Sequence, residues 1–455
     1  MPASPATRTV LRDLLTLAWP VVLARIGIMV MGLTDAIVVG NFSSTELAFH
    51  TLAWTPTSIV ITTAVGLLLG VQVMTARRLG EGRRGDVGAV LRRGLVYSLW
   101  LGGGSMIGLM LVGPWGLASI GLEDGLAEGA RLPLLVFSLS MPAYLVSVAA
   151  RFFLEALGKP KPGMVAMWVA NGAHLAPNLL LVPDLLGLGV DGALASSWAT
   201  FFARAALAVF LIVYIVRLPE ARALGIFRKA PRDPLAEAEQ RKVGYGAGSS
   251  YFIEVGAFAL MTLIAGRLGT NETAAWAVVL NISAIVFMIP MGLSSAAAVL
   301  VGRAFGAADA QGVMRAGLVS LAVISTLTLA IALIVWPTAP LLIGAYSRDQ
   351  ALIAIAVPAL VLATLFFVAD GIQAVAAQAN RAAGDIWWPT IMHFTAYGAV
   401  MMPLGWVLAP HMGVDGLVWA IIIASLVSSA LLSGRFIRVA RRMQRVASGE
   451  WRVPS

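Results

Sequence analysis

The 455-residue sequence contains no cysteine and few charged residues. The lack of cysteine excludes disulfide bonds, iron–sulfur clusters and zinc sites built from thiolates. Asp, Glu, Lys and Arg make up 12% of the chain, about half the share found in soluble proteins, whereas 59% of the residues are hydrophobic. A soluble fold cannot bury so much apolar surface. The composition therefore predicts an integral membrane protein.

Motifs of enzymes and of ATP-driven pumps are also missing. We find no nucleophile–base set, no metal-ligand cluster and no Walker phosphate loop, and the four histidines have no ligand-like spacing. The net charge of +9 would suggest a nucleic-acid partner in a soluble protein. In a membrane protein the simpler interpretation is that basic residues hold loops on the cytoplasmic side. We therefore expect no catalysis, no cofactor and no nucleic acid.

Twelve apolar runs are long enough to cross a bilayer, because one helical span needs about 20 residues. They begin near Leu14, Leu47, Gly94, Arg131, Met164, Gly192, Gly244, Thr273, Val313, Ala351, Trp387 and Val414. Basic residues cluster after the even-numbered runs, for example from Arg77 to Arg93 and from Arg217 to Lys242. The fold is thus predicted as all-α and multi-pass, with both termini and the long central loop in the cytoplasm.

The two halves of the chain resemble each other at a fixed spacing. Identical residues recur 226 positions apart at Gly40 and Gly266, Glu46 and Glu272, Gly66 and Gly292, Arg77 and Arg303, and Gly80 and Gly306. The tetrapeptide Gly189–Gly192 also recurs as Gly413–Gly416. Six spans in each half keep the same orientation, so the halves are predicted to be parallel repeats that rock against each other to give alternating access.

This duplication defines the expected domains. Residues 1–216 form an N-lobe with spans one to six, and residues 217–243 form a cytoplasmic linker. Residues 244–437 form a C-lobe with spans seven to twelve, and residues 438–455 form a cytoplasmic tail. One chain is sufficient for a two-lobe mechanism, so we expect a monomer in the lipid bilayer.

Four segments, in order along the chain, resemble motifs of the multidrug and toxic compound extrusion (MATE) family, closest to its NorM-like bacterial branch. They are Gly32–Ala36 with Gly40, Tyr251–Val255, Asn281 with Val286–Met291, and Ala369–Gln373 with Arg381 and Asp385. The resemblance covers nearly the whole chain. It implies a V-shaped fold of two lobes and an efflux antiporter that exchanges protons or Na⁺ for organic cations or drugs.

Three acids fall within the predicted spans: Asp35, Glu254 and Asp370. A charge at the bilayer centre costs about 2.5–3.5 kcal/mol on insertion scales, so each acid needs a reason to be there. The resemblance implies that Glu254 and Asp370 form a cation site in the second lobe, which takes a proton or Na⁺. Some members carry a tyrosine one turn before the aspartate, where this chain has Phe366, and this favours a proton. The alternative is a structural acid paired with a buried base.

Asp35 is expected to join polar residues of the fifth span, namely Asn171, His174 and Asn178, in a cation site of the first lobe. His174 and Asn178 are one helical turn apart and share a face. His174 departs from the family pattern and is a candidate proton carrier, because imidazole titrates near neutral pH. The alternative is a polar contact between packed helices.

Arg25 and Arg204 also fall within predicted spans, and the sequence does not assign their role. They keep open a rival function, a lipid-linked saccharide flippase of the same superfamily, which needs a basic cavity for pyrophosphate. The acids favour a small cationic substrate instead.

Overall fold

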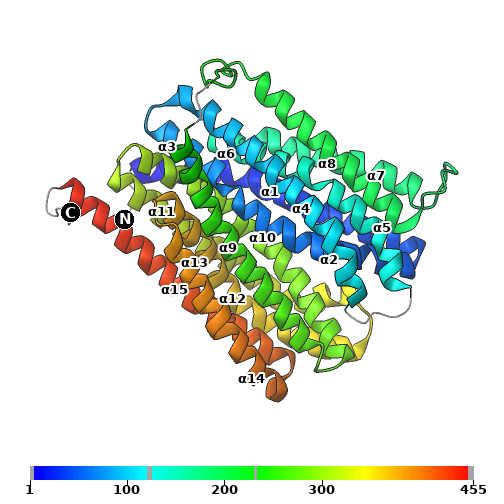
Figure 1. Ribbon diagram of the computed structural model, residues 1–455. Coiled ribbons are helices and arrows are strands. Elements are labelled where there is room, and N and C mark those ends of the chain that lie inside the picture. The colour runs from blue at the N-terminus through cyan, green and yellow to red at the C-terminus, as the bar shows by residue number, and fades with distance from the viewer. Residues whose placement is uncertain (1–4, 120–124, 230–232, 449–455) are drawn as a thin grey trace. The chain divides into compact units, whose positions relative to one another are not determined.

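The computed structural model describes residues 5–119, 125–229 and 233–448, which form helices and no strand (Figure 1). The first half contains α1 (Pro5–Phe42), α2 (Ser44–Leu67), α3 (Leu69–Gly80), the short η1 (Arg84–Asp86), α4 (Val87–Ser119), α5 (Leu126–Leu139), α6 (Met141–Ala156), α7 (Lys161–Leu181) and α8 (Gly192–Val216). The second half contains α9 (Pro234–Ala265), α10 (Thr270–Gly306), α11 (Ala310–Tyr346), α12 (Gln350–Ala382), α13 (Trp387–His393), the π-helix η2 (Phe394–Met401), α14 (Met402–Met412) and α15 (Val414–Ala447).

Most of these helices are long and apolar enough to cross a membrane. Among the described residues ten helices qualify, and the bent pair α5 and α6 makes an eleventh span. The remaining predicted span corresponds to α7, which has 21 residues. Its polar residues Asn171, His174 and Asn178 dilute its hydropathy, and these are residues expected to have a function. The all-α membrane fold is confirmed.

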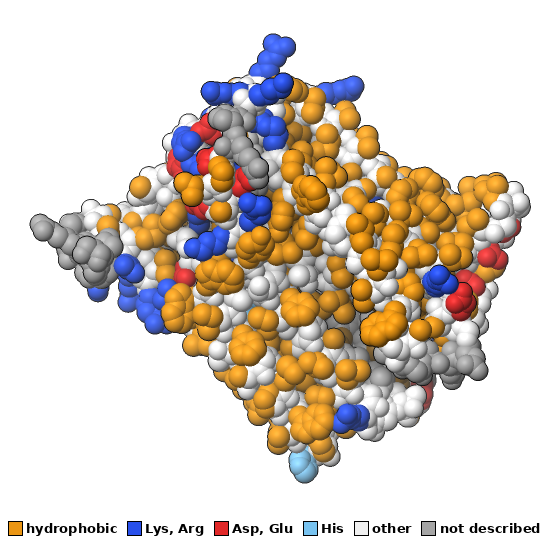
Figure 2. All heavy atoms as spheres, viewed as in Figure 1, with side chains coloured by type: hydrophobic (Ala, Val, Ile, Leu, Met, Phe, Trp, Pro, Cys, Tyr) orange, Lys and Arg blue, Asp and Glu red, His pale blue; other side chains and the backbone are white. Residues whose placement is uncertain are grey.

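Large apolar side chains lie on the outside of these helices. Trp100, Leu111, Trp115 and Leu341 are 77%, 73%, 71% and 76% exposed. Hydrophobic side chains cover much of the face drawn in Figure 2. In water such a surface would be unstable, whereas hydrocarbon chains solvate it without cost. The exposed apolar surface is therefore lipid-facing.

The internal duplication is visible in the helix boundaries. The span built from α2 and α3 runs from Ser44 to Gly80, and α10 runs from Thr270 to Gly306, with both ends 226 residues apart. The repeated tetrapeptides lie where the last long helix of each half begins. Gly192 and Gly413 have positive φ values of 50° and 59°, a conformation that favours glycine. These matches confirm the internal duplication.

The chain separates into two compact units. The N-unit contains Leu23–Leu79 and Arg83–Gly248, and the C-unit contains the residues up to Val22, Gly80–Gly82 and those from Ser249 onward. The lobe boundaries drawn from the sequence stay predictions. Helix α9 begins at Pro234 within the predicted linker, and α15 continues to Ala447 within the predicted tail. Residues 230–232 of the linker and 449–455 of the tail lie outside the described residues, as do residues 1–4 and 120–124 of the N-lobe.

Each unit packs its own helices around an apolar interior. In the N-unit α4 packs on α6, and α7 packs on α8. In the C-unit α12 packs against α10, α11 and α15. The fully buried Trp276 lies in the C-unit core, and its indole nitrogen donates a hydrogen bond of 3.1 Å to Thr262 Oγ1. These packed helices hold the buried polar side chains described next.

Candidate functional site

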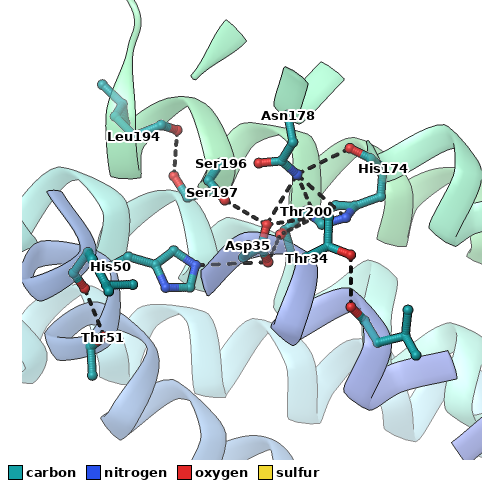
Figure 3. Close-up of polar contacts among 12 residues, drawn as sticks. Thr34, Asp35, His50, Thr51, His174, Asn178, Leu194, Ser196, Ser197 and Thr200 are labelled. Carbon is teal, nitrogen blue, oxygen red and sulfur yellow. Dashed lines mark hydrogen bonds and ion pairs between the residues drawn. The ribbon is translucent and has the colours of Figure 1, made fainter. Parts of the chain in front are cut away.

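The N-unit holds a polar cluster around Asp35 of α1, whose side chain is buried (Figure 3). Asn178 Nδ2 and Ser196 Oγ donate hydrogen bonds to Asp35 Oδ1 over 3.1 and 2.6 Å. Thr200 Oγ1 donates to Asp35 Oδ2 over 3.3 Å. Two donors thus come from α8 and one from α7. The carboxylate is held by directed side-chain donors from two helices.

Two buried histidines flank the same carboxylate. His174 Nε2 lies 3.0 Å from Asp35 Oδ1, and His50 Nε2 lies 3.9 Å from Asp35 Oδ2. His50 comes from α2, where its ring packs edge-on against Phe137 with the centroids 5.4 Å apart. A buried carboxylate is stable when an opposite charge compensates it. A proton on either imidazole supplies that charge, so this cluster can hold a proton inside the membrane.

The structure therefore brings Asp35, His174 and Asn178 together, as the sequence predicts. Asn171 contacts the backbone instead: its Nδ2 donates to the carbonyl oxygens of Gly27 and Met167 over 3.0 and 2.9 Å. It joins α7 to α1 at one end of the cluster and has no contact with Asp35.

Sequence reasoning missed His50, Ser196 and Thr200. Ser196 and Thr200 are one helical turn apart on α8. A pair of polar residues on one face of an apolar span could have identified them. For His50 the sequence offered only one indication of a role at the site, its position within a predicted span.

The start of α8 is fixed by an acid from another helix. Glu46 of α2 accepts a hydrogen bond of 2.8 Å from the backbone nitrogen of Ala193. A negative charge there is favourable, because the N-terminus of a helix carries unpaired N–H groups and a partial positive charge. A Cβ at Gly192 would lie 2.2 Å from the Glu46 carboxylate, so only glycine permits this approach. The repeated glycine thus positions the helix that presents Ser196 and Thr200.

The C-unit holds a second cluster, around Glu254 of α9 and Asp370 of α12. The two half-buried carboxyl groups lie close enough to interact electrostatically. Gln373 Nε2 donates a hydrogen bond of 3.2 Å to Asp370 Oδ1. Neither acid forms an ion pair with a described basic residue. Arg381 is within electrostatic range of Glu254, but its Nη2 donates to Ser250 Oγ over 2.6 Å. Two acids placed together without an ion-pair partner favour a cation site.

A π-helical turn contributes to the same cluster. Tyr397 of η2 is fully buried, and its phenol is near enough to Asp370 to interact with it. Among the described residues, Gln373 Oε1 and both ring nitrogens of His393 are buried without a hydrogen-bond partner. Buried polar atoms are normally paired, so unpaired ones need an explanation such as a bound proton, ion or water. π-Helical turns are frequent at functional sites.

The sequence predicted the two acids but not His393 or Tyr397. These residues are one turn apart within an otherwise apolar span, which was the signal for them. Phe366, which stands where some relatives have tyrosine, is buried and packs edge-on against Phe367 at 5.2 Å between centroids. In this chain the phenol near the aspartate comes from Tyr397 on a different helix.

Arg25 and Arg204 are buried rather than extended toward the membrane surface. Arg204 Nη1 donates a hydrogen bond of 2.7 Å to Ser140 Oγ, and its guanidinium lies 4.8 Å from the centre of the Tyr144 ring. The Arg25 guanidinium lies 5.7 Å from the centre of the Phe152 ring. Aromatic faces attract cations, which explains how these arginines are accommodated.

The chain matches a known family model in both of its halves. The family model MatE matches the chain twice, at residues 20–180 and 247–407. These are the two repeats; the first match contains Asp35, and the second contains Glu254 and Asp370. Two matches to one model support the duplication independently of the helix boundaries.

The chain is also similar to individual proteins over nearly its full length. It is 54% identical over 430 residues to a probable multidrug resistance protein NorM of Caulobacter vibrioides, covering 94% of this chain and 91% of that protein. It is 30% identical over 448 residues to a protein of the same description from Bradyrhizobium diazoefficiens, covering 95% and 94%.

A solved structure shares the fold. The chain matches the outward-facing conformation of a multidrug resistance MATE family transporter of the MOP superfamily with a TM-score of 0.89. The match covers 98% of this chain and 100% of that one at 17% identity. At this identity the likeness supports the fold alone.

Proposed function

The chain belongs to the MATE family of membrane transporters, a family that is not an enzyme family, and from this premise we propose that it exports organic cations and drugs by secondary-active antiport. The observation that carries the proposal is the pair Glu254 and Asp370, which lies inside a membrane protein and has no ion-pair partner in the described part of the chain. The 54% identical relative from Caulobacter, described as a probable multidrug resistance protein, supports drugs as the substrate class.

The charge of this acid pair changes during transport. Without a coupling ion the pair is negative and attracts a cationic substrate. When a proton or Na⁺ binds, the pair loses negative charge and the substrate is released. The acid pair therefore binds either the coupling ion or the cationic substrate, but not both at the same time. The oxygen atoms of Gln373 and Tyr397 beside Asp370 are additional ligands for the coupling ion.

The N-unit cluster carries a proton. Two of the groups that contact Asp35 are nitrogen atoms, Asn178 Nδ2 and His174 Nε2. A Na⁺ ion requires oxygen ligands instead. A proton on His174 forms a charge-assisted contact with Asp35 over 3.0 Å. Loss of this proton leaves a negative carboxylate and weakens the contact between α1 and α7. The proton thus controls how α1 packs.

Ion entry supplies enough energy for export. An ion that crosses 100 mV releases about 2.3 kcal/mol, and a tenfold concentration gradient adds about 1.4 kcal/mol. One ion therefore supports a several-hundredfold gradient of a neutral substrate. A monovalent cation exchanged one-for-one gains nothing from the voltage, so the stoichiometry decides the limit.

The protein operates as a monomer in the inner membrane of a bacterium. Basic residues after the even-numbered spans support cytoplasmic termini. The two units supply both halves of an alternating-access mechanism within one chain. The flippase alternative is not favoured, because the relatives are described as probable multidrug resistance proteins and because Arg25 and Arg204 pack on aromatic rings.

Efflux of ethidium from bacterial cells that lack their own pumps tests the proposal. Cells that express the protein should retain less dye than cells with an empty vector, and dissipation of the ion gradients should abolish the difference. Varying Na⁺ and pH separately identifies the coupling ion. Unchanged retention of ethidium and of a panel of other cationic dyes would contradict multidrug export.

The phenol of Tyr397 is expected to strengthen binding of the coupling ion. In the variant Tyr397→Phe the ring keeps its packing, but the oxygen near Asp370 is lost. We expect transport to persist, while the ion concentration for half-maximal efflux rises at least about tenfold, as for the loss of one hydrogen bond to a charged group. Phe366→Tyr, which adds a phenol one turn before Asp370, is the matched comparison. An unchanged ion dependence in Tyr397→Phe would remove Tyr397 from the site.

A further inference from the structure

A pocket of about 520 Å³ lies in the N-unit, where α4 meets the beginning of α9. Its polar end contains Arg92 and Arg93 of α4 and Arg241 of α9. Its other end contains Val96 and Trp100, further along α4. The antiport mechanism uses none of these residues.

The pocket has excess positive charge. Arg92 Nη1 donates to the carbonyl oxygens of Gly225 and Ile226, both over 2.8 Å, and Arg93 Nε donates to Gln240 Oε1 over 3.2 Å. These acceptors are neutral, and neither arginine forms an ion pair with a described carboxylate. Backbone and amide contacts hold the two guanidinium groups in place without cancelling their charge.

Two acids line the pocket, and both have other partners. Glu237 Oε2 lies 3.6 Å from Arg241 Nη2, and Asp233 Oδ1 accepts a hydrogen bond of 3.0 Å from the backbone of Ala236 at the start of α9. Both acids are within electrostatic range of Arg93. Three arginines against two acids leave one net positive charge, which suits a ligand with a single negative charge.

The apolar end of the pocket continues onto the lipid-facing surface. Arg92, Val96 and Trp100 follow one another at helical spacing and share a face of α4. Val96 and Trp100 are 56% and 77% exposed. At 1.5 Å per residue, Trp100 lies about 10 Å deeper along the helix than Arg93. The pocket therefore joins a cationic end to an apolar surface, and Trp is typical of the membrane interface.

We propose that this pocket binds an anionic phospholipid, with the phosphate between Arg92, Arg93 and Arg241 and an acyl chain along Val96 and Trp100. The base of the pocket is firmly built, because the buried Gln240 also donates from Nε2 to the carbonyl oxygen of Val90 over 3.1 Å. Through Arg92 the lipid stabilises the segment around Gly225, which follows α8. Basic pockets between spans on the cytoplasmic side bind anionic lipid headgroups in other membrane proteins.

The test measures lipid binding to the purified full-length protein in detergent by native mass spectrometry. The probes are phosphatidylglycerol and phosphatidylcholine with the same acyl chains. The variant Arg93→Gln with Arg241→Gln should lose about 30-fold in affinity for phosphatidylglycerol, since each basic residue near a membrane contributes about fivefold. The control, Arg438→Gln with Arg441→Gln, removes the same charge from exposed positions of α15 and should bind as the wild type does.

The variant Arg93→Lys with Arg241→Lys keeps both positive charges and controls for a folding defect. It should retain most of the affinity for phosphatidylglycerol. Equal binding of phosphatidylcholine, or an affinity of the glutamine variant within about threefold of wild type, would overturn the proposal. Displacement of phosphatidylglycerol by millimolar inorganic phosphate would assign the pocket to free anions instead. The readout does not depend on transport, so this proposal and the proposed function can fail separately.

Discussion

Ethidium efflux is expected to fall to the level of cells without the protein when Glu254→Gln and Asp370→Asn are combined. Each amide keeps the size of its acid but cannot alternate between a negative and a neutral state. The substrate then loses its attractive charge, and the ion loses its site. We expect each single substitution to reduce the initial efflux rate at least about tenfold, a loss of about 1.4 kcal/mol of stabilisation.

A control separates this loss from a general effect of removing an acid. Glu128 has an 80% exposed side chain at the start of α5, and Glu128→Gln should transport at the wild-type rate. Expression and melting temperature of the acid variants should match the wild type, because neither acid has an ion-pair partner to lose. Efflux at wild-type rate in the double variant would show that the C-unit acids do not couple transport.

Asp35→Asn is expected to flatten the dependence of the transport rate on pH. The carboxylate that pairs with a protonated His174 is lost, so the cluster no longer favours a proton on the imidazole. The wild-type rate should change severalfold between pH 5 and 8, whereas the variant rate should change less than about twofold. Transport in liposomes across this pH range, at a fixed membrane potential, measures the difference.

Two further substitutions separate the role of the charge from the role of packing. Ser196→Ala removes a donor 2.6 Å from Asp35 but leaves the carboxylate, so it should lower the melting temperature and keep the pH dependence. His174→Gln removes the proton carrier and should behave like Asp35→Asn. A wild-type pH profile in both Asp35→Asn and His174→Gln would exclude the N-unit cluster from proton coupling.

Composition and apolar periodicity were sufficient to predict the fold. The low charge, the twelve apolar runs and the offset of 226 residues lead directly to two repeats of membrane helices, since a lipid-facing helix must be apolar over its whole length. The exception is α7, where Asn171, His174 and Asn178 serve the interior of the N-unit. The same residues that weakened the span as a membrane helix marked it as functional.

The site was only partly visible in the sequence. Acids within apolar runs are conspicuous, so Asp35, Glu254 and Asp370 were found. Hydroxyl and imidazole groups are less conspicuous, because serine, threonine and histidine also pack helices without any further role. That His50 reaches Asp35 from α2, and Tyr397 reaches Asp370 from η2, depends on helix packing and on a π-helical turn. Neither follows from local sequence.

The most direct test of the account is transport by the purified protein in liposomes with imposed ion gradients. A pH gradient, a Na⁺ gradient or neither is applied, and the movement of a cationic dye is followed together with internal pH. The account predicts that dye moves against its gradient only when an ion gradient is present, and that the ion moves in the opposite direction at a constant ratio to the dye. Dye movement that only dissipates its own gradient, with no ion counter-movement, would contradict antiport.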